Sequence, residues 1–194
     1  VWTMEDNHEW QENVLLIDAD YVDRLVFNLS VQLERMLGRR IPKLDIARWV
    51  DYLALDGGLR PGENKTQVLF VYSKEKALLK NAVPSSLPAD LDGKCFHDNL
   101  GDFFCASFPV EEEIVSMERL YLQSVETLLA SSKVSNLMLV PDVEAYGHLL
   151  KGALSKSRKA LLFVTEPVTG FLCPQEILTY SLFAALGVKG EELS

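Results

Sequence analysis

The sequence predicts an α/β fold in which a mainly parallel, five-stranded sheet is covered by helices on both faces, a three-layer α/β/α sandwich. The strand-like segments are unbroken apolar runs, as in strands that are buried on both faces. Segments with helical periodicity separate them, and such β-α-β units form parallel sheets. The length of 194 residues, 48% of them apolar and 24% charged, suits one globular domain. We expect a polar lead over residues 1–12 and a single domain over residues 13–194.

The first half of the chain carries two predicted strands and two predicted helices. Residues 14–17 form an apolar run that ends at an acidic pair, and they are predicted to be the first strand. From Tyr21 onward, apolar residues recur with the helical period until Gly38, a residue typical of helix C-termini. Pro42 is predicted to open a second helix, and residues 68–72 to form the second strand.

The middle of the chain, residues 81–101, is predicted to be a long and mostly irregular connection, because it carries several Pro, Ser and Gly residues and few consecutive apolar ones. Beyond it the alternation of strands and helices continues. The predicted strands are 103–108, Asn136–Val140 and Ala160–Val164, and the predicted helices are 116–130, 143–154 and one that Pro174 opens.

Acidic residues follow two of these strands. Asp18 and Asp20 come after the first strand, and Asp142 and Glu144 come after the fourth. In open α/β sheets, ligands bind beyond the carboxyl ends of the strands where the strand order reverses, and the common orders place strands 1 and 4, or strands 1 and 3, side by side there. Converging carboxylates are ligands that Mg²⁺ or Mn²⁺ prefers. A water bound to such an ion can attack a phosphodiester.

The same positions also suit helix N-caps, which accept hydrogen bonds from free backbone N–H groups. Asp20 and Asp142 each precede a predicted helix. Capping is the favoured interpretation of Asp20. Asp18 lies at the very end of a buried strand, ahead of the predicted cap, and is the stronger candidate for a functional role.

Two segments carry a resemblance to a known family. Residues 14–20 (VLLIDAD) resemble the first strand of the NYN domains, a branch of the PIN-like nuclease superfamily, and residues 139–146 (LVPDVEAY) resemble their Ser-Gly-Asp-x-Asp-Phe motif. Spacing and order agree from about residue 14 to residue 164. The whole chain also resembles uncharacterised conserved proteins of Bacteroides-type bacteria.

The resemblance implies an Mg²⁺- or Mn²⁺-dependent ribonuclease that acts through a cluster of acids. It places metal ligands at Asp18, Asp142 and Glu144, and a further catalytic acid at Glu118, near the start of the third predicted helix.

Three departures from the family pattern support an alternative function. Ser124 stands where a second acid of that helix is expected, Val140 and Pro141 replace the Ser-Gly pair, and Glu144 is longer than the usual Asp. The alternative is a PIN-like domain with lost or weakened catalysis that serves as an interaction or regulatory module, as a homodimer.

Net charge, the length of apolar runs and cysteine content limit the partners and the cellular compartment that we expect. The net charge of −9 argues against general nucleic-acid coating, which depends on cations, so RNA is expected only at a local, metal-loaded crevice. No apolar run approaches the ~20 residues of a membrane span, so no membrane partner is expected. Three cysteines without a CxxC pair favour the cytoplasm, and Cys95 to Asp98 is interpreted as an ordinary loop.

A receiver-like signalling domain is less favoured. Such a domain needs a phospho-accepting Asp after its third strand and a Lys after its fifth, and this chain carries Phe108 with Pro109 and Thr165 with Glu166 there. Dinucleotide binding is also disfavoured, because an acidic pair replaces the Gly-rich turn after the first strand.

Overall fold

A computed structural model describes residues 10–194, so residues 1–9 of the predicted lead lie outside the described residues. The described part is an α/β fold built on a mostly parallel sheet of seven strands, in the order β5-β6-β3-β1-β7-β8-β9. The strands of this sheet are β1 (Asn13–Asp18), β3 (Lys65–Ser73), β5 (Cys95–Asp98), β6 (Gly101–Val110), β7 (Asn136–Val140), β8 (Ala160–Val164) and β9 (Gln175–Ile177). The helices are α1 (Ala19–Leu37), α2 (Ile46–Asp56), α3 (Met117–Ala130), α4 (Val143–Leu154) and α5 (Leu178–Ala185).

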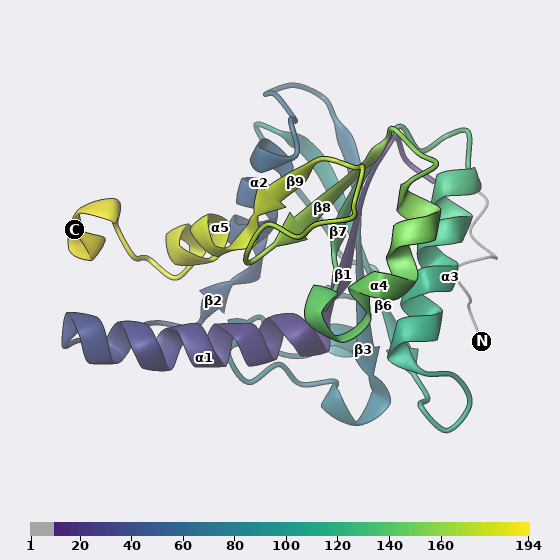
Figure 1. Ribbon diagram of the computed structural model, residues 1–194. Coiled ribbons are helices and arrows are strands. Elements are labelled where there is room, and N and C mark those ends of the chain that lie inside the picture. The colour runs from purple at the N-terminus through teal and green to yellow at the C-terminus, as the bar shows by residue number, and fades with distance from the viewer. Residues whose placement is uncertain (1–9) are drawn as a thin grey trace.

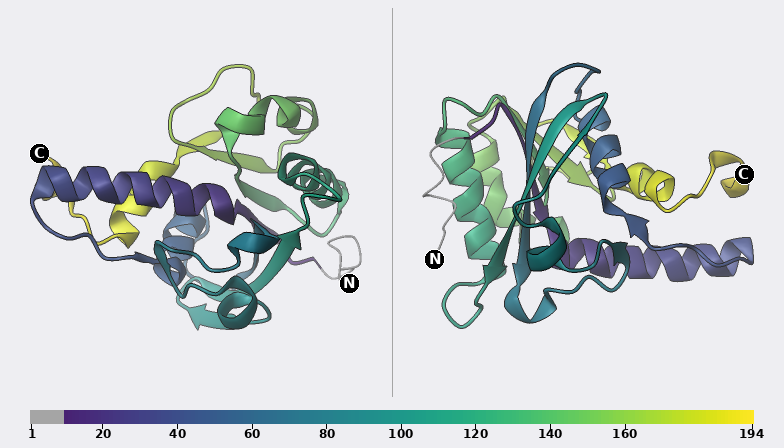
Figure 2. Two further views of the ribbon diagram at one scale, coloured as in Figure 1. Left: turned by 90° about the horizontal axis from the view of Figure 1, so that it is seen from below. Right: turned by 180° about the vertical axis from the view of Figure 1, so that it is seen from behind.

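Helices cover both faces of the sheet. Figure 1 shows α3 and α4 packed side by side on one face, with α1, α2 and α5 on the other, and Figure 2 shows the C-terminal half of α1 extending beyond the sheet. Side chains of the strands alternate between two apolar cores, one beneath each helical layer. Leu15, Ile17 and Phe70 belong to the core on the α1 side, while Leu16 and Leu69 belong to the core on the α3 side.

The first and fourth predicted strands are neighbours, as the sequence predicted. β1 pairs in parallel with β3 on one side and with β7 on the other, with Ile17 opposite both Phe70 and Val140. The chain leaves β1 toward β3 and later returns to its other side at β7. The carboxyl ends of β1 and β7 therefore meet at the point where the strand order reverses.

The prediction of a five-stranded sheet is wrong in number. The five predicted strands are all present and parallel to one another, as β1, β3, β6, β7 and β8. Two further strands extend the edges: β5 pairs antiparallel with β6, and β9 pairs in parallel with β8. The Cys95 to Asp98 segment is thus an edge strand and not a loop. A separate two-stranded sheet joins β2 (Leu44–Asp45) to β4 (Ala82–Val83).

Two predicted helix starts are also wrong. Pro42 does not open the second helix, which begins at Ile46 after Asp45, whose side chain accepts a hydrogen bond from the Arg48 amide. Pro174 does not open the last helix, because the residues after it form β9. In both places the backbone pairs with a distant strand before it turns into the helix.

The connection 81–101 is more ordered than predicted. Besides β4 and β5 it holds a π-helical turn, Leu87–Leu91, whose two end residues are buried. The Val83–Pro84 peptide bond is cis. Short 3-10 turns at Lys74–Lys76 and Gly190–Leu193 complete the described elements.

Candidate functional site

Three aspartates lie where β1 and β7 end, and we call this group the acidic edge: Asp18, Asp20 and Asp142. Asp18 is the last residue of β1, and Asp20 lies in the first turn of α1. Asp142 follows β7 and precedes α4. Burial is the main cause that raises the pKa of Asp18, and the negative charges of Asp20 and Asp142 add to it. The neighbouring ends of β1 and β7 thus bring Asp18 within electrostatic reach of the other two acids, while the site roles predicted for Asp18 and Asp142 stay predictions.

Asp18 is buried, with 3% of its surface exposed. Its Oδ1 accepts a hydrogen bond from the Tyr21 amide at 3.1 Å, and its Oδ2 accepts one from the Tyr146 hydroxyl at 2.8 Å. Burial raises the pKa of Asp18 to about 6, although the two hydrogen bonds oppose that shift. Asp18 is therefore the N-cap of α1. The capping role predicted for Asp20 is wrong, because Asp20 lies two residues later, within the first turn of the helix.

Two groups of the protein contact the Asp142 carboxylate. Its Oδ1 accepts a hydrogen bond from the Ala145 amide at 3.1 Å, so it caps α4 as the sequence predicted. Its Oδ2 forms an ion pair with the Arg24 guanidinium of α1, at 2.7 Å from Nη2. The Asp142 side chain is 13% exposed and that of Arg24 is 56% exposed, so the cation of this ion pair lies on the solvent side of the acid.

The Asp20 side chain contacts the last residue of β3. Its carboxylate accepts hydrogen bonds from both the backbone amide and the hydroxyl of Ser73. The Ser73 Oγ also lies 2.8 Å from an oxygen of Glu112, in the loop after β6. A hydroxyl has one hydrogen to donate, so the buried serine joins two carboxyl groups with a single shared donor.

The two glutamates of the predicted site lie outside this network. Glu118, in the first turn of α3, and Glu144, in the first turn of α4, are both exposed. Ser124, at the position where an acid was expected, is buried, and its Oγ donates to the Leu120 carbonyl one turn earlier in the same helix at 2.7 Å. The catalytic and metal-binding roles of Glu118 and Glu144 stay predictions.

The protein's own donors contact every carboxylate of the acidic edge. A lone pair of Asp142 is directed at Arg24, both oxygens of Asp18 accept protein hydrogen bonds, and Asp20 is bound to Ser73. Within residues 10–194, no three His, Cys, Asp or Glu side chains gather as ligands of one metal ion. Mg²⁺ keeps several waters and binds through carboxylate oxygens, so an ion at this edge would have to share Asp18 and Asp142 with these protein donors.

Sequence reasoning missed the partners of the acids. Arg24 lies four residues after Asp20, and Tyr146 lies four residues after Asp142, so each projects from the same helical face as an acid of the edge. The actual contacts are crossed, since Arg24 pairs with Asp142 and Tyr146 donates to Asp18, so this spacing does not reveal the pairs. Tyr146 in turn packs against Tyr121, with ring centroids 5.5 Å apart, and burial together with the Asp18 charge raises the pKa of Tyr146 far above its ordinary value.

Comparison with known proteins places the chain in a family. The sequence pattern of DUF6621, a family of unknown function, matches residues 7–193. The chain belongs to DUF6621. The match spans all three acids of the edge and their partners. No curated protein and no solved structure matches this DUF6621 chain. Along residues 10–194 of it, no helix is long and apolar enough to span a membrane.

Proposed function

We propose that this chain is a binding or regulatory module on a PIN-like scaffold, in which the acids at the strand ends are bound by the protein's own donors instead of holding a catalytic metal ion. The observation that carries the proposal is the Arg24–Asp142 ion pair of 2.7 Å, because it gives the aspartate a protein cation at the position where the nuclease resemblance implies a metal. The Tyr146 hydroxyl on Asp18 and the Ser73 hydroxyl on Asp20 support it.

The proposal is tested by assaying the purified protein on single-stranded RNA with Mg²⁺ or Mn²⁺. We expect no cleavage above that of an Asp18→Asn/Asp142→Asn double variant. Cleavage by the natural protein that each single substitution abolishes would overturn the proposal. Glu126→Gln, at an exposed position of α3 outside the predicted site, is the matched control for loss of one negative charge.

A structural role for Asp142 also has a direct readout. Asp142→Ala removes the cap of α4 together with the ion pair, and loss of a helix cap costs about 1–2 kcal/mol. We expect chemical denaturation to show a destabilisation of that size, with Asp142→Asn retaining most of the capping contribution. No change in stability with the alanine variant would contradict a structural role.

The second candidate is the metal-dependent ribonuclease itself. It is favoured by the convergence of Asp18 and Asp142 from neighbouring strands at the reversal of strand order. The RNA assay above decides between the two, because only the ribonuclease loses an activity when these acids are neutralised.

A further inference from the structure

The seven-stranded sheet ends on one side at β5, and part of the backbone of this strand faces outward. β5 is the last strand in the order of the sheet, so it pairs on one side only, with β6. Just before the strand, the Cys105 amide donates to the Lys94 carbonyl, so residue 94 bonds inward. Inward and outward residues alternate along an antiparallel pair, so the N–H and C=O groups of Cys95 and His97 point away from the sheet. Such an edge is a template for a strand of another chain.

The same edge carries two carboxyl groups without a cation. The side chains of Asp98, at the end of β5, and Asp51, in α2, are hydrogen-bonded to each other, which requires a proton on one of them. Burial and then the Asp98 carboxyl raise the pKa of Asp51 to about 7. Neither acid forms an ion pair with any residue between 10 and 194, and Oδ1 of Asp51 is buried without a hydrogen-bond partner among them.

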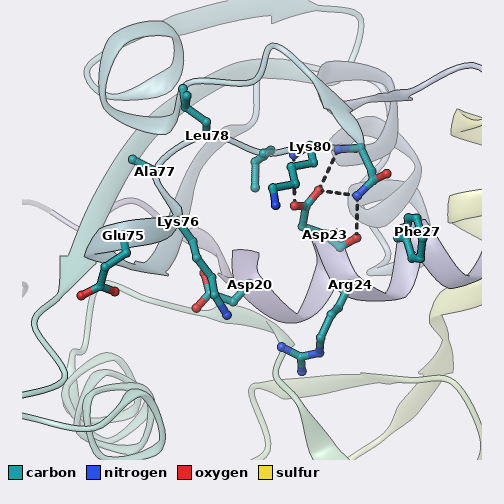
Figure 3. Close-up of a pocket in the computed structure, with 11 residues that line it drawn as sticks. Asp20, Asp23, Arg24, Phe27, Glu75, Lys76, Ala77, Leu78 and Lys80 are labelled. Atoms are coloured by element: carbon teal, nitrogen blue, oxygen red, sulfur yellow. Dashed lines mark hydrogen bonds between the residues drawn. The ribbon is translucent and has the colours of Figure 1, made fainter.

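This pair differs from acids elsewhere in the fold. Asp23 of α1 accepts hydrogen bonds from two backbone amides of the facing segment, at 3.0 and 2.9 Å, and from an asparagine side chain (Figure 3). Among residues 10–194, Asp98 accepts one amide bond, from Leu100 at 2.8 Å, and the further charge that acts on Asp51 is another acid, Asp45. A cation brought by a second molecule would meet charge that the chain itself does not compensate.

Lys94 provides a matching cation at the other end of β5. Lys94 is exposed, and its ammonium group forms no ion pair with any residue between 10 and 194. Lys94, Phe96 and Asp98 are spaced by two residues, so they share one face of the strand. On that face the Phe96 ring stacks on the Phe103 ring of β6, with centroids 4.7 Å apart. The face therefore presents a cation, an aromatic ring and an acid in sequence.

We propose that two copies of this chain pair antiparallel along β5, about a two-fold axis at Phe96, so that Lys94 of each copy binds Asp98 of the other. Cys95 then lies opposite His97 of the second copy, and their outward N–H and C=O groups form the hydrogen bonds of the pair. The two Phe96 rings meet at the axis, where cross-strand aromatic contacts are favourable. This inference goes beyond the proposed function, because β5 lies at the end of the sheet and outside the acidic edge.

Charge selects this register among the possible pairings. A shift by two residues keeps the outward backbone groups facing each other, but it places Lys94 or Asp98 opposite Phe96 and leaves the charges without partners. Parallel pairing in register would place like charges side by side, which is unfavourable. The antiparallel pairing about Phe96 joins opposite charges at both ends of the strand.

The first test is sedimentation of the natural protein between about 1 μM and 1 mM, where we expect a dimer that forms with rising concentration. Lys94→Glu is expected to weaken the dimer at least about tenfold, because it changes both symmetric contacts. Lys43→Glu makes the same charge change at an exposed position outside β5 and is expected to leave the dimer unchanged. A protein that stays monomeric over this range, or a dimer that both variants leave alike, would overturn the inference.

Mixing two variants tests the predicted contact itself. Lys94→Glu and Asp98→Lys chains are each expected to be monomeric, because each homodimer would hold two repelling pairs. A mixture of the two is expected to form a heterodimer, since both of its contacts join opposite charges. Two chains that are folded by circular dichroism and do not associate when mixed would overturn the inference.

A cysteine at the axis tests the register without changing any charge, and it also decides the case in which Asp98→Lys does not fold. Phe96→Cys in a Cys95→Ser chain is expected to form an intermolecular disulfide with oxidised glutathione, because position 96 meets its own copy. Lys43→Cys in the same Cys95→Ser chain is the control. A folded Phe96→Cys chain that crosslinks no faster than this control would overturn the inference, whatever the outcome of the RNA assay.

Discussion

The substitution Asp18→Asn measures how much ionisation of the buried Asp18 carboxyl lowers the free energy of unfolding. Burial raises the pKa of Asp18 from 3.8 to about 6, so the folded protein binds this proton more tightly than the unfolded chain does. Stability from this group is fully present below pH ~4 and is lost as the pH rises to ~6. A shift of roughly two pH units corresponds to about 3 kcal/mol between these limits. Asn resembles the protonated acid and does not ionise.

The assay is urea denaturation of the natural protein and of Asp18→Asn at several pH values from 4 to 7.5. We expect the difference in unfolding free energy to move in favour of the variant by up to about 3 kcal/mol as the pH rises. Taking the difference removes the titration of all other groups that the substitution leaves alone. Glu118→Gln, at an exposed position, controls for the loss of one charge. A difference that stays constant with pH would refute the assignment of a raised pKa to Asp18.

Three further predictions concern single contacts. Tyr146→Phe removes the hydroxyl that donates to Asp18, and a hydrogen bond to a charged group contributes about 1.5–3 kcal/mol. Because Asp18 is ionised above its pKa of about 6, thermal unfolding should show a larger loss of stability at pH 8 than at pH 5. Gly101→Ala should prevent folding or destabilise strongly in expression and melting assays, because φ is +110° and a Cβ would clash with the backbone carbonyl oxygen of Asn64. Burial and the adjacent Asp98 carboxyl raise the pKa of Asp51 to about 7, so Asp51→Asn should reduce the loss of stability between pH 4 and 7, and an unchanged pH profile would contradict that assignment.

The sequence was informative wherever a pattern is local. Unbroken apolar runs identified β1, β3, β7 and β8, because the central residues of a strand buried on both faces are apolar, while polar residues stand at the strand ends. Asp142 was recognised as a cap from its place between a strand and a helix. These features depend on neighbouring residues in the chain, which a sequence displays directly.

The edges of the sheet could not be predicted in the same way. β5 has a mixed sequence with partly exposed residues, and it becomes a strand because it pairs with β6. β9 has three residues and depends on β8, with the Leu162 amide bound to the Pro174 carbonyl just before it. The prolines at 42 and 174 misled the prediction of helix starts, because tertiary pairing decided the backbone there.

The chemistry of the acids was the least predictable part. Arg24 and Asp142 are 118 residues apart in sequence, so their pairing appears only when α1 and α4 are brought together. Sequence reasoning therefore located the acids and could not find the cation beside them. The Arg24–Asp142 ion pair joins α1 to the start of α4, and the metal-binding role expected for Asp142 stays a prediction.

The most direct test of a structural acidic edge is a titration of the ¹⁵N-labelled protein with Mn²⁺, monitored by paramagnetic broadening of the amides at residues 18–21 and 142–146. We predict no selective broadening in the natural protein, and its appearance in Arg24→Met, where the Asp142 carboxylate loses its cation. Selective broadening in the natural protein that disappears in Asp142→Asn would contradict the account and would support a metal-dependent nuclease.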